Sequence, residues 1–223
     1  MKAKLSLIKS ILVASSVVAI ATMSANSATA ADFSFGNIAG GDTVGDAYQS
    51  SFGFNVTAGE ANSVLFNIFN SGNAAASSMF ISRVFFDTGS NANLLSNLIT
   101  NSGNSGTVGF TKDSSPGNLP QAANLATAFS TDFSASSNNG GGNKWGVQGG
   151  ESLGIAFNGN YNSVVSALNN GSLRLGLHVQ ALPNGASDSY VAEPVPEPTT
   201  MLGSVLALGL FAKIKQRRAQ KAA

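Results

Sequence analysis

Apolar and polar residues alternate without interruption in LRLGLHVQ, residues 173–180. Because successive side chains of a β-strand point to opposite faces, this period of two predicts a strand with its leucines and Val179 on the buried face and Arg174 and His178 on the other. The same alternation recurs at Phe33 and Phe35, at Phe52, Phe54 and Val56, at Val108 and Phe110, and at Leu153, Ile155 and Phe157. Two further runs, 64–69 and 79–86, are apolar on both faces, which is typical of central strands.

Turns and a little helix account for the segments between these strands. Clusters of Asn, Gly, Ser and Asp separate them, as tight turns require. Apolar residues at helical spacing between positions 161 and 168 predict a short helix, with Asn160 as its cap and Gly171 as its end. Leu94 to Ile99 would form another helical turn or two. The pattern predicts an all-β domain, a sandwich or jelly-roll-like fold with one or two short helices, over residues 31–185.

Charge and composition narrow the classes of function. The chain has 12 basic and 11 acidic residues, a formal charge of +1. Between Ala31 and Pro196, however, only four basic residues stand against ten acidic ones, which leaves a formal charge of −6. The basic footprint of a nucleic-acid-binding protein is therefore absent. The chain has no cysteine, which excludes disulfides and thiolate metal sites, and no cofactor is expected.

Residues 1–30 have the three parts of a secretory signal peptide. Three lysines within the first nine residues form a positively charged start, and residues 11–23 are mostly apolar. Ala28 and Ala30 occupy the small-x-small positions of a cleavage site, so the mature chain is expected to begin at Ala31. A retained N-terminal anchor is the alternative.

The other end of the chain carries three features in a fixed order. After a linker at residues 186–198, Pro196, Glu197 and Pro198 form a stiff, exposed turn. The uncharged helix that follows spans about 22 Å, which is short for a bilayer core of about 30 Å. It ends in a basic cluster of Lys213, Lys215, Arg217 and Arg218, which the positive-inside rule places in the cytoplasm. Residues 199–223 are thus predicted to be a short single-pass transmembrane helix with a basic tail.

This tail resembles the PEP-CTERM sorting signal, and PEPTTMLGS at residues 196–204 is similar to its cyanobacterial form. The resemblance implies that an exosortase, a membrane-embedded transpeptidase-like enzyme, recognises Pro196, Glu197 and Pro198. It also implies that the chain, once cut by signal peptidase, passes through an inner-membrane intermediate. Its destination would be the cell surface or extracellular matrix of a Gram-negative-type, cyanobacterial cell, where it would accompany exopolysaccharide. The match covers Val195 to about Arg218, and an ordinary single-pass anchor is the alternative.

One segment fits the motif of a hydrolase. Residues 150–154, GESLG, match G-x-S-x-G, with Ser152 as nucleophile and His178, the only histidine, as base. The motif needs its serine between a strand and a helix, and here a strand-like run follows the serine. The sequence therefore favours the start of a strand, and no enzyme is expected. His178 also lacks the partner ligands that a zinc site needs.

Two further features suggest ligands only weakly. Residues 87–93 offer oxygen atoms at alternate positions, as calcium sites do, but they contain one carboxylate, so an ordinary Asx-rich turn and no metal site are predicted. Trp145 lies in a Gly-rich loop and is a candidate for stacking on a sugar ring, although a tryptophan that closes a core is commoner. The sequence as a whole predicts a structural surface or matrix protein associated with exopolysaccharide. The alternative is a carbohydrate-binding module for the cell's own exopolysaccharide, and a remote one is a hydrolase that uses Ser152 and His178.

Overall fold

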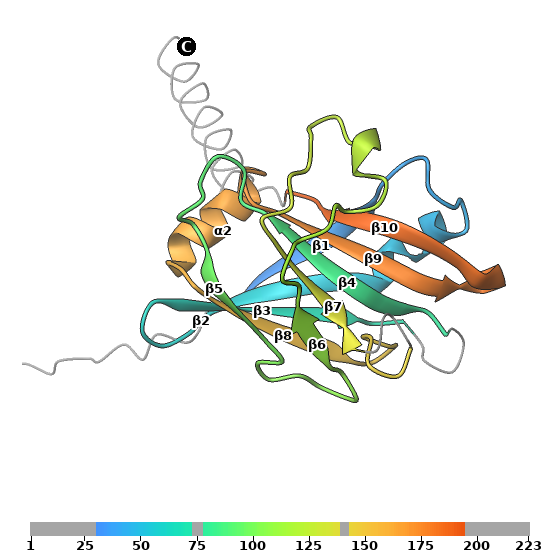
Figure 1. Cartoon of the computed structure of the whole chain (residues 1–223), viewed down its shortest axis with the longest axis horizontal. Helices are drawn as coiled ribbons and strands as arrows, with labels where there is room; N and C mark the ends of the chain where they lie inside the picture. The colour runs from blue at the N-terminus through green and yellow to red at the C-terminus, as the bar shows by residue number, and fades with distance from the viewer. Residues whose placement is uncertain (1–29, 73–77, 139–142, 195–223) are drawn as a thin grey trace, which may run out of the picture.

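The protein forms one ten-stranded antiparallel sheet that curls until its two edges nearly meet (Figure 1). The computed structural model describes residues 30–72, 78–138 and 143–194. The strand order is β5-β8-β3-β2-β1-β10-β9-β4-β7-β6. The strands are β1 (Ala31–Asn37), β2 (Phe52–Ala58), β3 (Ser63–Asn70), β4 (Phe80–Asp87), β5 (Ser96–Thr100), β6 (Phe110–Lys112), β7 (Phe133–Ser137), β8 (Ser152–Asn158), β9 (Arg174–Leu182) and β10 (Ala186–Ala192). Helical segments are the α-helix α2 (Tyr161–Asn169) and the 3₁₀ turns η1 (Gly45–Ser51), η2 (Ala122–Asn124) and η3 (Pro183–Gly185).

Strand β1 joins the two halves of this sheet. Its first residues, 31–34, pair with β2, and its last, 35–37, pair with β10. We call β5, β8, β3 and β2 the first half and β10, β9, β4, β7 and β6 the second half. The inward faces of the halves pack on each other. For example, the ring centres of Phe66 on β3 and Phe86 on β4 lie 5.2 Å apart. The core therefore sits inside the curl.

The alternating pattern correctly predicted the inward faces of the strands. Leu175, Leu177 and Val179 of β9 are all fully buried, as are Leu153 and Ile155 of β8. An all-β fold is thus confirmed. Helix α2 is also confirmed: Asn160 Oδ1 accepts a hydrogen bond from Ser163 N (3.1 Å) as the cap, and Gly171 follows the helix with a φ of +74°.

The two fully apolar runs behave differently from each other. Strand β4 is buried on both faces, as predicted, because Phe85 packs on Ile38 and Leu119 outside the curl while its neighbours face the core. Strand β3 lies between β2 and β8, but its burial alternates, and Leu65 and Phe69 on its outer face are only half-buried. The difference arises because a loop covers the outer face of β4.

That cover is the long connection between β6 and β7, residues 113–132. Leu119 of this loop packs on the outer face of β9 at Gly176, where an added Cβ atom would lie only 2.6 Å from the leucine side chain. Glycine at this position lets the loop approach the sheet closely. The outer face of the second half is therefore a second, smaller hydrophobic layer made with Ile38 and Phe85.

The side chain of Asn101 closes the gap between the two edge strands, β5 and β6. Its Oδ1 accepts a hydrogen bond from Phe110 N (2.9 Å), and its Nδ2 donates to Phe110 O (2.8 Å). Thr100 Oγ1 donates to the same carbonyl oxygen (3.0 Å). One side-chain amide thus satisfies the backbone of Phe110 much as a neighbouring strand would, and this edge of the sheet is not left open.

Three predictions of local structure were wrong. Leu94 to Ile99 forms no helix, since Ser96–Thr100 is strand β5. The predictions of a linker at 186–198 and of a domain boundary at 185 were wrong, because Ala186–Ala192 is strand β10, which is hydrogen-bonded between β1 and β9. The strand expected to include Val108 begins two residues later, because β6 starts at Phe110.

The two ends of the chain lie outside the described residues. These ends hold most of the predicted signal peptide, including Ala28, and the whole predicted sorting tail. Ala30 and Ala31, on either side of the predicted cleavage site, are described, and Ala31 is the first residue of β1. Within the described ranges, no helix combines the length and apolar character needed to cross a membrane.

Candidate functional site

A depression lined by asparagines lies where three loops meet at one end of the first half. Its volume is about 310 Å³. We call it the asparagine depression; its lining residues are Asn62, Asn91, Asn93, Leu94, Ser96, Asn158, Gly159, Asn160 and Ser163. They come from the β2–β3 turn, the connection from β4 to β5, and the junction of β8 with α2. No lining residue is charged.

Backbone hydrogen bonds hold these three segments in place. Gly159 N donates to Asn62 O (2.9 Å), which ties the β8–α2 junction to the β2–β3 turn. Asn158 is the register partner of both Ser63 on β3 and Ser96 on β5. Strand pairing and this bond therefore fix Asn62, Ser96, Asn158 and Gly159 relative to one another.

The β2–β3 turn that forms one wall has an unusual backbone. Ala61 and Asn62 are consecutive residues with φ values of +51° and +59°. Two positive φ angles in a row define a hairpin turn of type I′, which suits Asn at the second position but disfavours an alanine at the first. The strain at Ala61 is offset by the hydrogen bonds between Gly59 N and Ser63 O (2.8 Å) and between Ser63 N and Glu60 O (3.1 Å). The turn thus presents Asn62 in one orientation.

Four of the five asparagine side chains in the depression are unpaired. Among the described residues, the amides of Asn62, Asn91, Asn93 and Asn158 have no hydrogen-bond partner in the protein, whereas the Asn160 amide is used as the cap of α2. Each side-chain amide carries an acceptor oxygen and two donor hydrogens. The depression therefore offers several donors and acceptors together, without charge.

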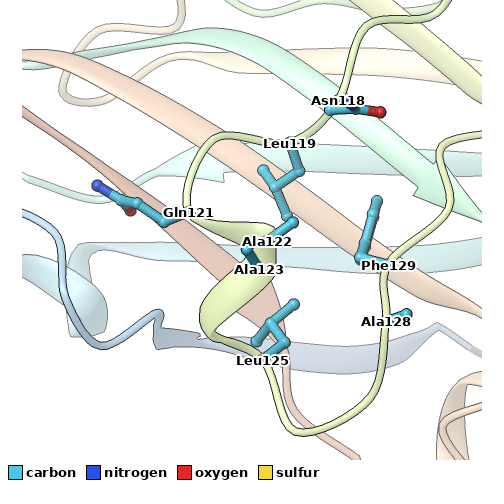
Figure 2. A pocket seen from close by; sticks show the side chains of 8 residues that line it. All are labelled: Asn118, Leu119, Gln121, Ala122, Ala123, Leu125, Ala128 and Phe129. Carbon is cyan, nitrogen blue, oxygen red and sulfur yellow. The ribbon is translucent and has the colours of Figure 1, made fainter.

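A second depression lies within the loop that covers β9 (Figure 2). It measures about 450 Å³ and is lined mainly by apolar side chains, among them Leu119, Leu125 and Phe129. These three also form the outer hydrophobic layer with Ile38 and Phe85. Gln121 at its rim is committed elsewhere, since its Oε1 accepts a hydrogen bond from Ser189 N (3.1 Å). This depression belongs to the packing of the loop on the sheet.

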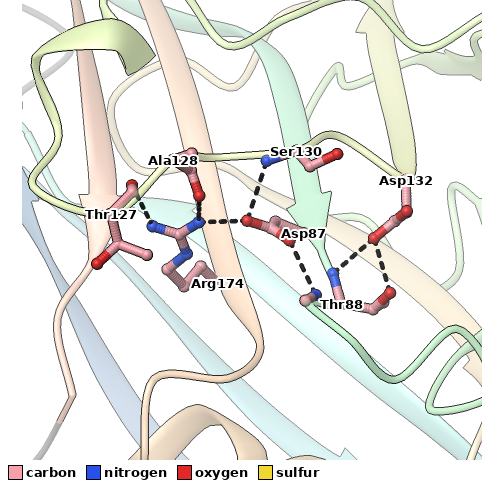
Figure 3. Close-up of polar contacts among 8 residues, drawn as sticks. Asp87, Thr88, Thr127, Ala128, Ser130, Asp132 and Arg174 are labelled. Atoms are coloured by element: carbon pink, nitrogen blue, oxygen red, sulfur yellow. Dashed lines mark hydrogen bonds and ion pairs between the residues drawn. The ribbon is translucent and has the colours of Figure 1, made fainter.

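An ion pair anchors the far end of the same loop (Figure 3). Arg174 on β9 pairs with Asp87 at the end of β4 and also donates to the carbonyl oxygens of Thr127 and Ala128. Asp87 further accepts hydrogen bonds from Gly89 N (2.9 Å) and Ser130 N (3.1 Å). Beside it, Asp132 Oδ2 accepts from Thr88 N (2.8 Å) and Thr88 Oγ1 (2.7 Å).

This arrangement leaves residues 87–93 as an Asx-type turn. The Asp87 carboxylate is occupied by a guanidinium and two backbone amides, so it is not available to calcium. Across the described part of the chain, no three carboxylate, histidine or cysteine side chains are grouped closely enough to hold a metal ion. Asn91 and Asn93 of the same segment point instead to the asparagine depression.

Trp145 lies apart from both depressions. Its ring is half-buried, and Lys144 Nζ lies 5.0 Å from the ring centre. Its carbonyl oxygen accepts a hydrogen bond from Gly109 N (3.0 Å), which holds it beside the start of β6. Trp145 is therefore not part of the core, and one face of its ring is shared with a lysine.

The proposed nucleophile and base of a hydrolase are not arranged as such a site requires. Ser152 begins strand β8, where it exchanges backbone hydrogen bonds with Ser105, rather than standing on a turn between a strand and a helix. His178 lies on β9 in the other half, and its Nδ1 is 3.3 Å from the hydroxyl of the fully buried Ser189. Burial, and then the positive charge of Arg83, lower the pKa of His178. The prediction that a strand begins in residues 150–154 is confirmed, and Ser152 does not occupy the strand-to-helix turn that the G-x-S-x-G motif needs.

Asp188 is a buried carboxylate that the sequence did not reveal. It is fully buried on β10, and its Oδ2 has no hydrogen-bond partner among the described residues. Gly45 packs directly on it, since an added Cβ there would lie 2.0 Å from Oδ2. Burial raises the pKa of Asp188, and the negative charges of Asp46 and Asp42 raise it further. Ser187, Asp188 and Ser189 are adjacent polar residues. Such a run is typical of a linker, so the sequence did not predict this strand.

Replacing Asp188 with asparagine is expected to stabilise the protein at neutral pH, by about 1 kcal/mol or more, because a buried and unpaired charge is removed. A carboxyl whose folded-state pKa is raised contributes stability below its unfolded pKa of about 3.9 and loses it as the pH rises through the folded value. The advantage of Asp188→Asn should therefore grow as the pH rises. Urea unfolding at a series of pH values measures it, with the exposed Asp32→Asn as control. The same dependence of the free energy of unfolding on pH in Asp188→Asn and in the wild type would contradict this prediction.

No family model, no curated protein and no solved structure matches this chain. The function is therefore argued from the residues and the geometry. The sorting residues Pro196, Glu197 and Pro198 and the basic cluster at 213–218 lie outside the described residues. The asparagine depression is a polar, ligand-sized feature of the described residues, and sequence spacing gave no sign of it.

Proposed function

We propose that this chain is an exported surface or matrix protein, delivered by an exosortase, whose β domain has a structural role. One observation carries the proposal: the fold begins and ends where the two signals do. Strand β1 starts at Ala31, the residue after the predicted cleavage site, and β10 ends at Ala192, four residues before Pro196. Both signals can be removed without taking a residue from any strand.

Delivery would follow from the order of the parts. The signal peptide directs the chain across the inner membrane, where signal peptidase cuts after Ala30. The apolar segment from Met201 to Ala212 then holds the chain in that membrane, with Lys213 and its neighbours on the cytoplasmic side. The stiff turn at Glu197 is presented outside the membrane to the exosortase, and the domain is displayed on the surface or enters the matrix.

The character of the domain fits an extracellular partner such as exopolysaccharide better than nucleic acid. Its excess of acidic residues, a formal −6 between Ala31 and Pro196, would repel a phosphate backbone. Its stability comes from packing without disulfides. We also propose that the curled sheet is of the sandwich or jelly-roll type, which is supported by two packed halves joined through β1.

Replacing Glu197 with alanine is expected to leave the protein membrane-bound with its tail intact, because the feature gripped by the exosortase is lost. The measurement is the intact mass of protein recovered from the membrane, the cell surface and the medium. Wild-type protein should begin at Ala31 and end near Pro196, with any added mass identifying its attachment. Glu193→Ala, the same change at an exposed residue four positions upstream, is the matched control. Normal processing of Glu197→Ala, or wild-type protein ending at Ala223, would refute the proposal.

A further inference from the structure

We infer that the asparagine depression binds a neutral, polyhydroxylated ligand, such as a hexose unit of a polysaccharide. The inference rests on the proposed surface role only for the choice of ligands to test. Its physical basis is the set of unpaired amides from Asn62, Asn91, Asn93 and Asn158. Because each amide both donates and accepts, a group of them matches vicinal hydroxyls, which also do both.

The chemistry of the lining excludes other ligand classes. No lysine or arginine lines the depression, so a phosphate, sulfate or uronate would find no counter-charge there. No aspartate or glutamate lines it either, so a cationic ligand is equally unsuited. Leu94 is the one apolar side chain of the lining; it is 7% exposed and packs mainly into the core. A volume of about 310 Å³ lies at the small end of ligand sites, which suits one ring rather than a long segment.

The site is also organised before any ligand arrives. The strained turn at Ala61 and Asn62 is held by backbone hydrogen bonds, and Gly159 N fixes the opposite wall to Asn62 O. Strain kept in place by surrounding structure is a feature of functional sites. Many other asparagines of the domain are occupied: those at 101 and 104, for example, bond to backbone groups that would otherwise be unpaired. At this depression, four amides without such a task line one surface.

The binding test uses the full chain in a sugar-free zwitterionic detergent. Isothermal titration calorimetry is performed with cellohexaose, maltohexaose, xylohexaose and mannohexaose as neutral ligands, and with a hexamer of galacturonate as an acidic one. We expect at least one neutral hexamer to bind and the acidic hexamer not to bind. Binding of the acidic hexamer alone, or of none of the five, would overturn the inference.

Three variants locate the site. Asn62→Gly removes one amide and suits the positive φ of that position, so the fold should keep its stability. Asn91→Ala removes a second amide. Each is expected to weaken binding about tenfold, which is the loss of roughly one good hydrogen bond. The matched control, Asn162→Ala, changes an exposed asparagine of α2 that does not line the depression, and should bind as wild type does.

Other outcomes separate this inference from its competitors. If Trp145→Ala abolishes binding while Asn62→Gly and Asn91→Ala do not, the sugar site is at Trp145 and the inference fails. Normal binding with failed tail processing would refute the sorting proposal and keep the inference. Normal tail processing without sugar binding would refute the inference and keep the sorting proposal.

Discussion

Phe66→Ala is expected to lower the free energy of unfolding by about 4 kcal/mol, because a buried phenyl ring is replaced by a cavity. Phe66 is fully buried inside the curl. Its ring centre lies 5.2 Å from that of Phe86 and 5.8 Å from that of Phe157, both in edge-on contact, and 6.3 Å from that of Phe54. These neighbours belong to three other strands across both halves, so no single side chain can move to fill the space.

Urea-induced unfolding, followed by fluorescence and by circular dichroism, measures this loss. The control is Phe69→Ala on the same strand, where the ring lies on the half-buried outer face and its removal should cost about 1 kcal/mol. Similar losses for the two variants would mean that the halves do not pack as described.

The second large effect is expected for Arg174→Met, which should cost about 3 kcal/mol. The substitution leaves the Asp87 carboxylate, whose side chain is 3% exposed, without its counter-charge. It also releases the carbonyl oxygens of Thr127 and Ala128, which fix the loop over β9. Local opening of residues 113–132 should therefore accompany the loss of global stability.

The described residues supply a natural comparison in a second ion pair. Arg83 pairs with Asp113 (3.1 Å), but its side chain is 34% exposed, so Arg83→Met should cost about 1 kcal/mol or less. Amide hydrogen exchange of residues 113–132 distinguishes the two variants, since only Arg174→Met should speed exchange near Ser130. Equal effects of both substitutions would show that burial does not set the strength of the Arg174 pair.

Sequence reasoning succeeded where one strand face is apolar and the other polar. The alternation in β8 and β9 fixed which side chains are buried, because a slip of one residue would expose every leucine. It failed for β10, where Asp188 and Ser189 point to opposite faces of the sheet and are both buried. This strand pairs with the neighbouring β9 and with β1, which is distant in sequence, and local composition carries no record of the pairing with β1.

The same limit applies to the asparagine depression. Asn62 and Asn91 lie in two connections and Asn158 ends strand β8, and each of these segments alone looks like ordinary surface. Only the pairing of β8 with β3 and β5 brings them together. Leu94 to Ile99 was mistaken for helix for a related reason: its leucines reach the core through a turn and a short edge strand. The residues proposed as a sorting signal, by contrast, are adjacent in the sequence, so predicting them as a set used no three-dimensional context.

The pairing of the first strand with the last has a consequence for the timing of folding. A chain that leaves an export channel N-terminus first presents β1 early, yet three of the seven register partners of β1 lie in residues 190–192. The sheet can close only after the segment just before Pro196 has emerged, and pairing between such distant residues is slow. On the proposed delivery route, the apolar tail would by that moment be entering the membrane. Completion of the domain and arrival of the proposed sorting segment would then be nearly simultaneous, and the proposed exosortase would meet a substrate that has only just finished folding.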